Sequence, residues 1–311
     1  MEQGYVQSQQ IQPRPAPTEY FQGALLGLVL APTALIFDGV PAAAIESINQ
    51  WVDTSIQSVQ MFLSGQHQAK AAQRETAANV YLLASLPALL RYANDWQRRW
   101  NYLRSAGWLC IDNSAKDPDW ATAQILCLGD FLEIILSKHL PNNAWAGKRH
   151  PDAWGSLTHL KWRIEQYSAA GLCDQQCQRY QWILGKLTMG LADNGQWQLS
   201  QASASEPTDE PTDALNATGL KDSASFVTAV LSAVVHPESY SLAVRMASQG
   251  GGHSLIAGIV SGALGGRASL PVLWQLNSID KVSVTVATAD ALCDQWAGIQ
   301  PLTNQFCERT T

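Results

Sequence analysis

Apolar residues recur at three- and four-residue spacing along most of the chain, which is the period of an α-helix. The clearest example lies in residues 76–104, where Pro87 is expected to kink or restart the helix. Charged residues of this segment, such as Arg99, lie mainly off the apolar stripe. The stripe itself consists of Leu82, Leu86, Leu89, Ala93, Trp96, Trp100 and Leu103.

The same period predicts helices over residues 119–140, 156–169, 175–191, 223–235 and 238–248. Residues 281–287 differ, because Val282, Val284 and Val286 alternate with other residues as they would in a β-strand. A single strand has no partner with which to pair, so we expect a helix with β-branched residues here. The chain shows no strand–helix alternation of the kind that builds a parallel sheet. The predicted fold class is therefore all-α.

Two segments interrupt the helical pattern. Residues 1–19 are rich in Gln and Pro and have almost no apolar residue to bury, which predicts a flexible N-terminal tail. Residues 201–222 collect Ser, Thr, Pro and acidic residues, which predicts an exposed loop. We therefore expect one helical domain over residues 20–300 and a C-terminal tail at residues 301–311.

Composition narrows the classes of partner. The chain has 311 residues, of which 46% are hydrophobic, and this is enough for a sizeable buried core. The net charge is −6 and the Lys and Arg residues are scattered, so we expect no nucleic-acid partner. The N-terminus lacks a basic start followed directly by an apolar region, which favours a cytoplasmic protein. The apolar run at residues 23–37 is shorter than the roughly 20 residues of a membrane span and contains Pro32, so we expect a buried helix there and no span.

Six cysteines are dispersed along the chain. Cys173 and Cys177 are four residues apart, so a helix would place them on one face. This pair could form a disulfide or share a metal ion. Since no second Cys or His pair lies nearby at ligand spacing, we favour two reduced cysteines.

Two segments, one near each end of the predicted domain, carry a recognisable pattern. The first is GALLGL at residues 23–28. The second, at residues 226–266, reads as a helix, a turn containing His236, a short helix, a glycine-rich loop and a small-residue helix, and LPVLW follows at residues 270–274. Together they resemble the ADP-ribosylglycohydrolase family. The resemblance implies a single orthogonal helical bundle built around a central cleft.

The small-residue helix at residues 255–266 indicates close helix packing, independently of the family resemblance. It contains Gly258, Gly262, Gly265 and Gly266. Because a glycine inside a helix costs up to about 1 kcal/mol relative to alanine, their number indicates a neighbour that approaches closely. A tightly packed core helix with no functional role explains these residues equally well.

The acidic residues that the family resemblance would imply are missing. Members of the family hold a binuclear magnesium site largely with aspartates, and their C-terminal motif is Gly-x-Asp-x-Asp-Thr. The two aspartate positions correspond here to Gly252 and Ser254, and the threonine position corresponds to Leu255. Residues 239–279 contain no Asp or Glu at all, whatever the exact alignment. Hard divalent cations need oxygen ligands, so we expect no magnesium cofactor and no catalytic residue at these positions.

The other two acidic motifs of the family are also absent. The family follows its first helix with Gly-Asp-Ala-x-Gly, whereas this chain has APTA at residues 31–34. The nearest match to its Thr-Asp-Asp-Thr motif is DTS at residues 53–55, which lacks the double acid. The three losses together disfavour magnesium-dependent hydrolysis.

The candidate ligand-binding residues are therefore those of the glycine-rich loop: Gly250, Gly251, Gly252, His253 and Ser254. The glycines could present backbone N–H groups to a phosphate at a helix N-terminus, or simply form a tight turn. His253 could contact an anion or a soft metal or act as a base, since its ordinary pKa is about 6.5. Alternatively, it fills the space of the absent metals and hydrogen-bonds a carbonyl, which is the interpretation that we favour.

Three functional hypotheses follow. The first is a non-catalytic relative of the ADP-ribosylglycohydrolases that binds ADP-ribose, a related nucleotide or a protein partner. The second is a divergent hydrolase in which Asp38, Asp53, Asp112 or Asp130 forms a new site beside His253. The third is a structural subunit, which an exposed patch rich in some of the twelve tryptophans would favour.

Overall fold

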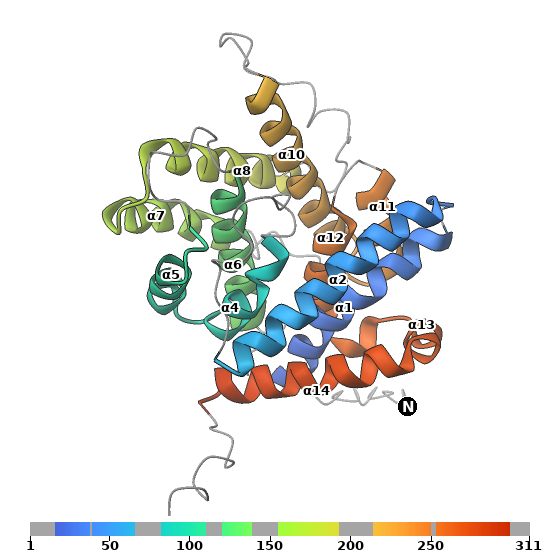
Figure 1. Cartoon of the computed structure of the whole chain (residues 1–311). Coiled ribbons are helices and arrows are strands. Elements are labelled where there is room, and N and C mark those ends of the chain that lie inside the picture. Colours follow the sequence, from blue (N-terminus) through green and yellow to red (C-terminus); the bar gives the residue numbers. More distant parts are fainter. Residues whose placement is uncertain are drawn as a thin grey trace, which may run out of the picture.

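The computed structural model describes residues 16–37, 39–65, 82–109, 120–138, 155–192, 214–249 and 253–298. All regular secondary structure in these ranges is helical, which confirms the all-α class (Figure 1). The first half comprises α1 (Pro17–Phe37), α2 (Ala42–Leu63), α4 (Leu86–Arg91), α5 (Trp96–Ser105), α6 (Trp120–Lys138) and α7 (Gly155–Ala169). The second half comprises α8 (Asp174–Ala192), α10 (Ala214–Val235), α11 (Tyr240–Gln249), α12 (Ser254–Gly265), the 3-10 helix η3 (Arg267–Ser269), α13 (Val272–Asn277) and α14 (Ile279–Trp296).

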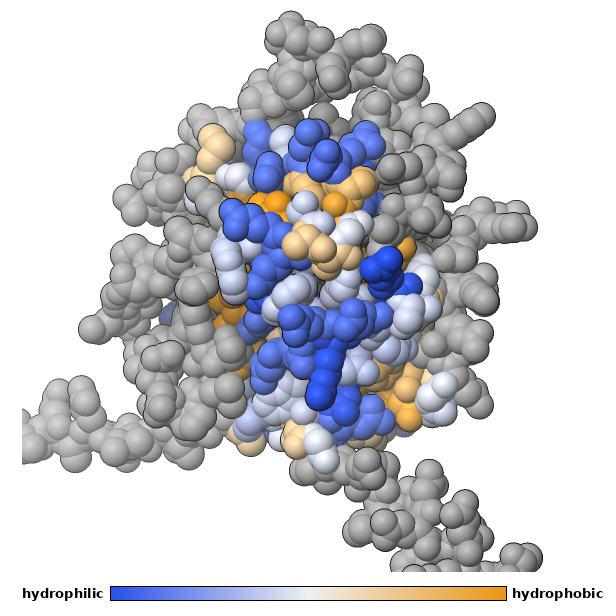
Figure 2. Space-filling view, turned by 90° about the vertical axis from the view of Figure 1, so that its left-hand side faces the viewer, coloured by the Kyte–Doolittle hydropathy of each residue, from blue (hydrophilic) through white to orange (hydrophobic). Residues whose placement is uncertain are grey.

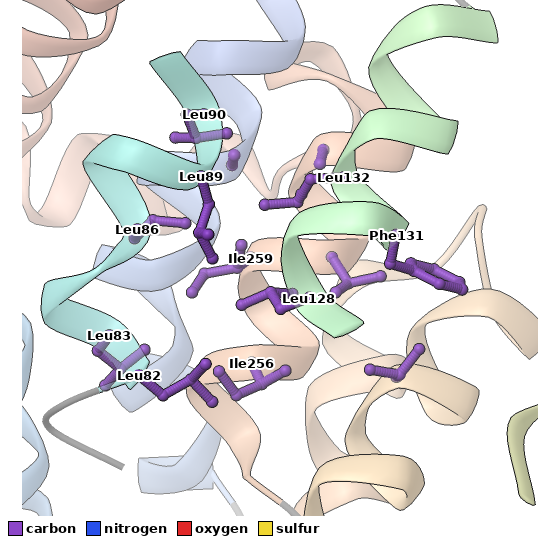
Figure 3. Close-up of a cluster of buried hydrophobic side chains, with 14 of the residues drawn as sticks. Leu82, Leu83, Leu86, Leu89, Leu90, Leu128, Phe131, Leu132, Ile256 and Ile259 are labelled. Carbon is purple, nitrogen blue, oxygen red and sulfur yellow. The ribbon is translucent and has the colours of Figure 1, made fainter. Parts of the chain in front are cut away.

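Helices from the two ends of the chain form one side of the molecule. In Figure 1, α1 lies beside α12 and α2 packs against α1, with α13 and α14 below them, while α5, α6, α7 and α8 form the opposite side. A buried apolar cluster joins the two sides where α4, α6 and α12 meet (Figure 3). Its labelled members are Leu82, Leu83, Leu86, Leu89, Leu90, Leu128, Phe131, Leu132, Ile256 and Ile259.

Most helices predicted from the apolar period are present. The helix expected over residues 76–104 is divided in the described part: Pro87 lies in the first turn of α4, and α5 begins anew after Asp95. The Asp95 carboxylate caps α5, accepting a hydrogen bond of 3.0 Å from the backbone N–H of Arg98. The alternating valines at residues 281–287 lie in α14, which confirms the helical interpretation of that segment.

The predicted segment boundaries need correction at two points. α1 begins at Pro17, so the last residues of the predicted tail at 1–19 are helical. α10 begins at Ala214, so the loop predicted at residues 201–222 is wrong for residues 214–222, which contain good helix formers and continue into an apolar helix. Residues 1–15, 201–213 and 301–311 lie outside the described residues.

α1 is longer than its apolar run suggests. It spans 21 residues, and Pro32 lies inside it without ending it. Within the described ranges, α1 alone is long and apolar enough to cross a membrane, a test that core helices of soluble proteins also pass. Here 78% of its most apolar window is buried inside the protein, as expected for a core helix.

α1 and α12 pack backbone against backbone, through what we call the glycine seam: Gly23, Gly27, Gly258 and Gly262. A Cβ atom on Gly262 would lie 1.9 Å from the carbonyl oxygen of Gly23, and one on Gly27 would lie 2.1 Å from that of Gly258. Gly23 faces Gly262 and Gly27 faces Gly258, so the helices run antiparallel. The C-terminal end of α1 therefore lies beside the first turn of α12.

Candidate functional site

A pocket of about 190 Å³ opens where the end of α1, the beginning of α2, the helical residues 82–84, the end of α11 and the start of α12 meet. The antiparallel glycine seam explains its position, because it brings the end of α1 to the start of α12. The described residues that line the pocket are Leu35, Val40, Ile48, Trp51, Leu82, Leu83, Ser248, His253, Ser254, Leu255 and Ile256.

The pocket is mainly apolar. None of its described lining residues carries a carboxylate, an ammonium or a guanidinium group. Its polar side chains are Trp51 on α2 and three that lie close together in the sequence, Ser248, His253 and Ser254. A pocket with apolar walls and a few convergent polar groups is the usual form of a small-molecule site.

His253 and Ser254, two of the five predicted site residues, line this pocket. His253 directly precedes α12, and its carbonyl oxygen accepts the first hydrogen bond of that helix, 3.0 Å from the backbone nitrogen of Ala257. Its own backbone N–H donates to the carbonyl oxygen of Ser225 on α10, at 3.4 Å. The other three predicted residues, Gly250, Gly251 and Gly252, lie outside the described residues.

Two of the segments that the family resemblance equates with metal-binding motifs lie together here. A Cβ atom on Gly258 of α12 would lie 3.1 Å from the Cβ of Ala31, the first residue of the APTA segment on α1. Leu35, just after that segment, lines the pocket together with Ser254. The third segment, at residues 53–55, is on α2, but Asp53 is exposed and binds Lys281 of α14, with 2.9 Å between Oδ1 and Nζ.

The acids proposed for a divergent hydrolase do not converge on the pocket in the described part of the chain. Asp53 and Asp130 are absent from the described pocket lining, and Asp130 is fully buried among other side chains. The expectation that either stands beside His253 is therefore wrong, because each is already paired with a cation elsewhere. Asp38 and Asp112 lie outside the described residues.

Asp130 belongs to what we call the charge cluster: Arg99, Asp130, Glu133, Arg163, Tyr167 and Tyr180. The Asp130 carboxylate accepts hydrogen bonds from the Arg99 guanidinium, from Tyr167 at 2.8 Å and from Tyr180 at 2.6 Å. Burial, together with the neighbouring Asp130 charge, raises the pKa of both tyrosines well above the usual value near 10, so both remain hydrogen-bond donors.

The charge cluster joins four helices at a distance from the pocket lining. Glu133 on α6 binds Arg99 on α5 at 3.0 Å and Arg163 on α7 at 2.8 Å. The Arg163 guanidinium also lies over the ring of Trp96, 5.2 Å from its centroid. We assign the cluster a structural role, since a buried carboxylate is stable only when it is paired and hydrogen-bonded.

Other candidate features from the sequence do not form sites in the described part of the chain. Cys173 and Cys177 are both free, and the described residues contain no group of three or more His, Cys, Asp or Glu side chains that could hold a metal. Of the described tryptophan side chains, Trp162 is the exposed one, so the described surface has no tryptophan-rich patch. The face over α5 and α7 is mainly hydrophilic, with small separate apolar areas (Figure 2).

Five of the exposed apolar side chains in the described part of the chain are aliphatic and lie on α13 and α14. They are Val272, Leu273, Leu276, Ile279 and Val284.

Comparisons with models of known protein families, with curated proteins and with solved structures gave no match to this chain.

Proposed function

We propose that the protein is a non-catalytic relative of the ADP-ribosylglycohydrolases that acts by binding a small ligand in the pocket at the start of α12. One observation carries this proposal. The segment that corresponds to the C-terminal metal-binding motif of the family contributes His253, Ser254 and Leu255 to a pocket, Leu35 directly after the APTA segment lines the same pocket, and the described lining has no carboxylate. ADP-ribose or a related nucleotide is the ligand class that the resemblance implies, and a cytoplasmic location fits such a ligand.

The chemistry of the lining favours binding over hydrolysis. Two divalent cations close together need several carboxylates, both to neutralise their charge and to fill their coordination shells. Ser254 offers one neutral oxygen in place of an aspartate, and Leu255 offers none. The apolar walls of the pocket do not depend on metal ions, so they remain available to a ligand.

The test is calorimetric titration of the full-length protein with ADP-ribose, once with magnesium and once with a chelator. We expect binding of similar strength under both conditions and no release of ADP-ribose from an ADP-ribosylated substrate. Replacing Trp51 with alanine should weaken binding, because Trp51 lines the pocket. Replacing Trp162 is the matched control, because Trp162 is exposed and is absent from the lining.

Other outcomes would favour the alternatives. Magnesium-dependent binding together with hydrolysis would overturn the proposal in favour of the divergent hydrolase, and Asp38 and Asp112 would be the first residues to replace. An absence of binding under both conditions would favour a structural subunit. The exposed aliphatic side chains of α13 and α14 would then be the first surface to examine.

A further inference from the structure

We infer that the pocket itself selects an uncharged, planar ring compound with one polar edge, and that any phosphate of a larger ligand lies outside it. This inference rests on the proposed binding function of the same pocket and names the class of ligand group that it takes. Four properties of the pocket lead to it: its charge, its size, its apolar and aromatic walls, and the arrangement of its polar groups.

The charge of the lining disfavours an anion inside the pocket. None of the described lining residues is Lys or Arg, and the chain as a whole carries a net charge of −6. The first turn of α12 contributes a partial positive charge equivalent to about half a unit. A diphosphate carries several times that charge, and burying it without a cation is costly. A neutral group meets no such penalty.

The size of the pocket matches one ring system. Its volume of about 190 Å³ lies near that of a cavity of about 150 Å³ that binds benzene in another protein. It is below the roughly 300–1,000 Å³ that is typical of sites for drug-sized ligands. A whole dinucleotide-like molecule therefore does not fit inside, whereas a single or small fused ring does.

The walls suit a flat ring. Apolar side chains reach the pocket from α1, α2 and the helical residues 82–84, and Trp51 adds an aromatic surface. Leu82, Leu83 and Ile256 lie at one end of the buried cluster of Figure 3 and continue from there into the pocket lining. Aromatic side chains stack on planar rings and bury much area at little entropic cost.

Polar groups other than Trp51 come from one short stretch of the chain. Ser248, His253 and Ser254 all lie at the junction of α11 and α12. Hydroxyl and imidazole groups can both donate and accept hydrogen bonds, so they match a ring nitrogen or an amide rather than a hydrocarbon. A heterocycle with a polar edge, such as adenine or nicotinamide, has this combination.

The experiment compares four probes with the full-length protein: adenine, nicotinamide, indole and inorganic pyrophosphate. Calorimetry and the change in tryptophan fluorescence would report binding, and competition would show whether the probes share a site. We expect adenine or nicotinamide to bind more tightly than indole, and pyrophosphate not to displace them.

Trp51→Ala should weaken ring binding about tenfold or more, and Val40→Trp should block it by filling the pocket. Trp162→Ala should leave it unchanged, and circular dichroism would verify that each variant is folded.

The inference and the proposed function fail in distinguishable ways. If ADP-ribose binds and pyrophosphate displaces it while the ring compounds do not bind, the inference is overturned and non-catalytic binding stands. If ring binding is unaffected in folded Trp51→Ala and Val40→Trp variants, the inference is overturned because the rings bind elsewhere. Magnesium-dependent hydrolysis instead overturns the proposed function, and the probe titrations still decide which group the pocket holds.

Discussion

The glycine seam and the charge cluster hold two parts of the same helical fold together by opposite means. In the seam, α1 and α12 approach so closely that no side chain fits between them. In the cluster, long charged side chains from α5, α6 and α7 fill the interior, and Arg99 and Asp130 are fully buried. The seam requires that its glycines carry no side chain, whereas the cluster requires its charged and tyrosine side chains to be present as partners for one another.

This difference separates stability from ligand binding. The seam sets the position of the pocket, because it aligns the end of α1 with the start of α12. No described pocket residue belongs to the charge cluster. We therefore expect damage to the cluster to lower stability without changing the pocket, and damage to the seam to change both.

The largest effect on stability is expected from Arg99→Met. This substitution leaves the Asp130 carboxylate buried without its main cation, which should lower the free energy of unfolding by about 3–5 kcal/mol. Arg98→Met is the matched control, because the Arg98 side chain is exposed and pairs with its neighbour Asp95, so its loss should stay within about 1 kcal/mol. Urea unfolding would measure both. Equal losses in the two variants would contradict the structural role of the cluster.

A smaller but more informative effect is expected from Gly262→Ala in the seam. The added methyl group would overlap the carbonyl of Gly23, so α1 and α12 must separate. The free energy of unfolding should fall by about 1–3 kcal/mol, and ligand affinity should fall with it. Gly185→Ala in α8 is the control: no atom lies within 4 Å of the added Cβ, so stability should rise by up to about 1 kcal/mol. If Gly262→Ala leaves stability unchanged, α1 and α12 can separate at little cost in free energy, which would contradict the close packing of the seam.

A pair of hydroxyl deletions compares the two regions directly. Tyr180 donates to the Asp130 carboxylate in the cluster, whereas Tyr240 donates to the carbonyl oxygen of Gly27 in the seam, at 2.5 Å. A hydrogen bond to a charged group contributes about 1.5–3 kcal/mol and one to a neutral group about 1 kcal/mol. Tyr180→Phe should therefore destabilise the protein more than Tyr240→Phe in thermal or urea unfolding. The reverse order would mean that Asp130 is satisfied by its other donors.

The sequence predicted most helices of this fold, because an amphipathic stripe is a local property. It did not predict the burial of Arg99, which lies off the stripe of its own segment. Its partner Asp130 is 31 positions away, and the local pattern contains no sign of that pairing. The available signal was the pair of acids Asp130 and Glu133 within the mainly apolar run of residues 125–136, where a buried carboxylate requires a cation.

The candidate site was predicted only in part for a related reason. Ser254 stood out because it occupies a position where the family resemblance implies a metal ligand, and His253 because it is the histidine of the same glycine-rich loop. Trp51 and Leu82 did not, because their place in the pocket depends on how α2 and the helical residues 82–84 pack against α12. The length of α1 was underestimated because its first turns are polar, and Gln22 there binds Asp290 of α14 at 2.6 Å.

The smallest expected effect is the loss of stability at alkaline pH, and it tests whether the two regions open together. Burial raises the pKa of Tyr180 in the cluster, and of Tyr240, which bonds to Gly27 of the seam, well above the usual value near 10. Above pH 10 the unfolded chain releases these phenol protons while the folded protein keeps them, so stability is complete below pH 10 and falls as the pH rises. Each buried phenol should steepen the fall by up to about 1.4 kcal/mol per pH unit.

Urea unfolding between pH 8 and pH 11 would measure these slopes in the Tyr180→Phe and Tyr240→Phe variants. Tyr102→Phe is the reference: burial, with the neighbouring Tyr92, raises the pKa of Tyr102 to about 12, but this side chain is only half-buried. Equal reductions of the slope in the first two variants would mean that the cluster and the seam unfold as one unit. A reduction confined to Tyr240→Phe would mean that the cluster already opens to solvent at high pH, so that the glycine seam is the last part of the fold to be lost.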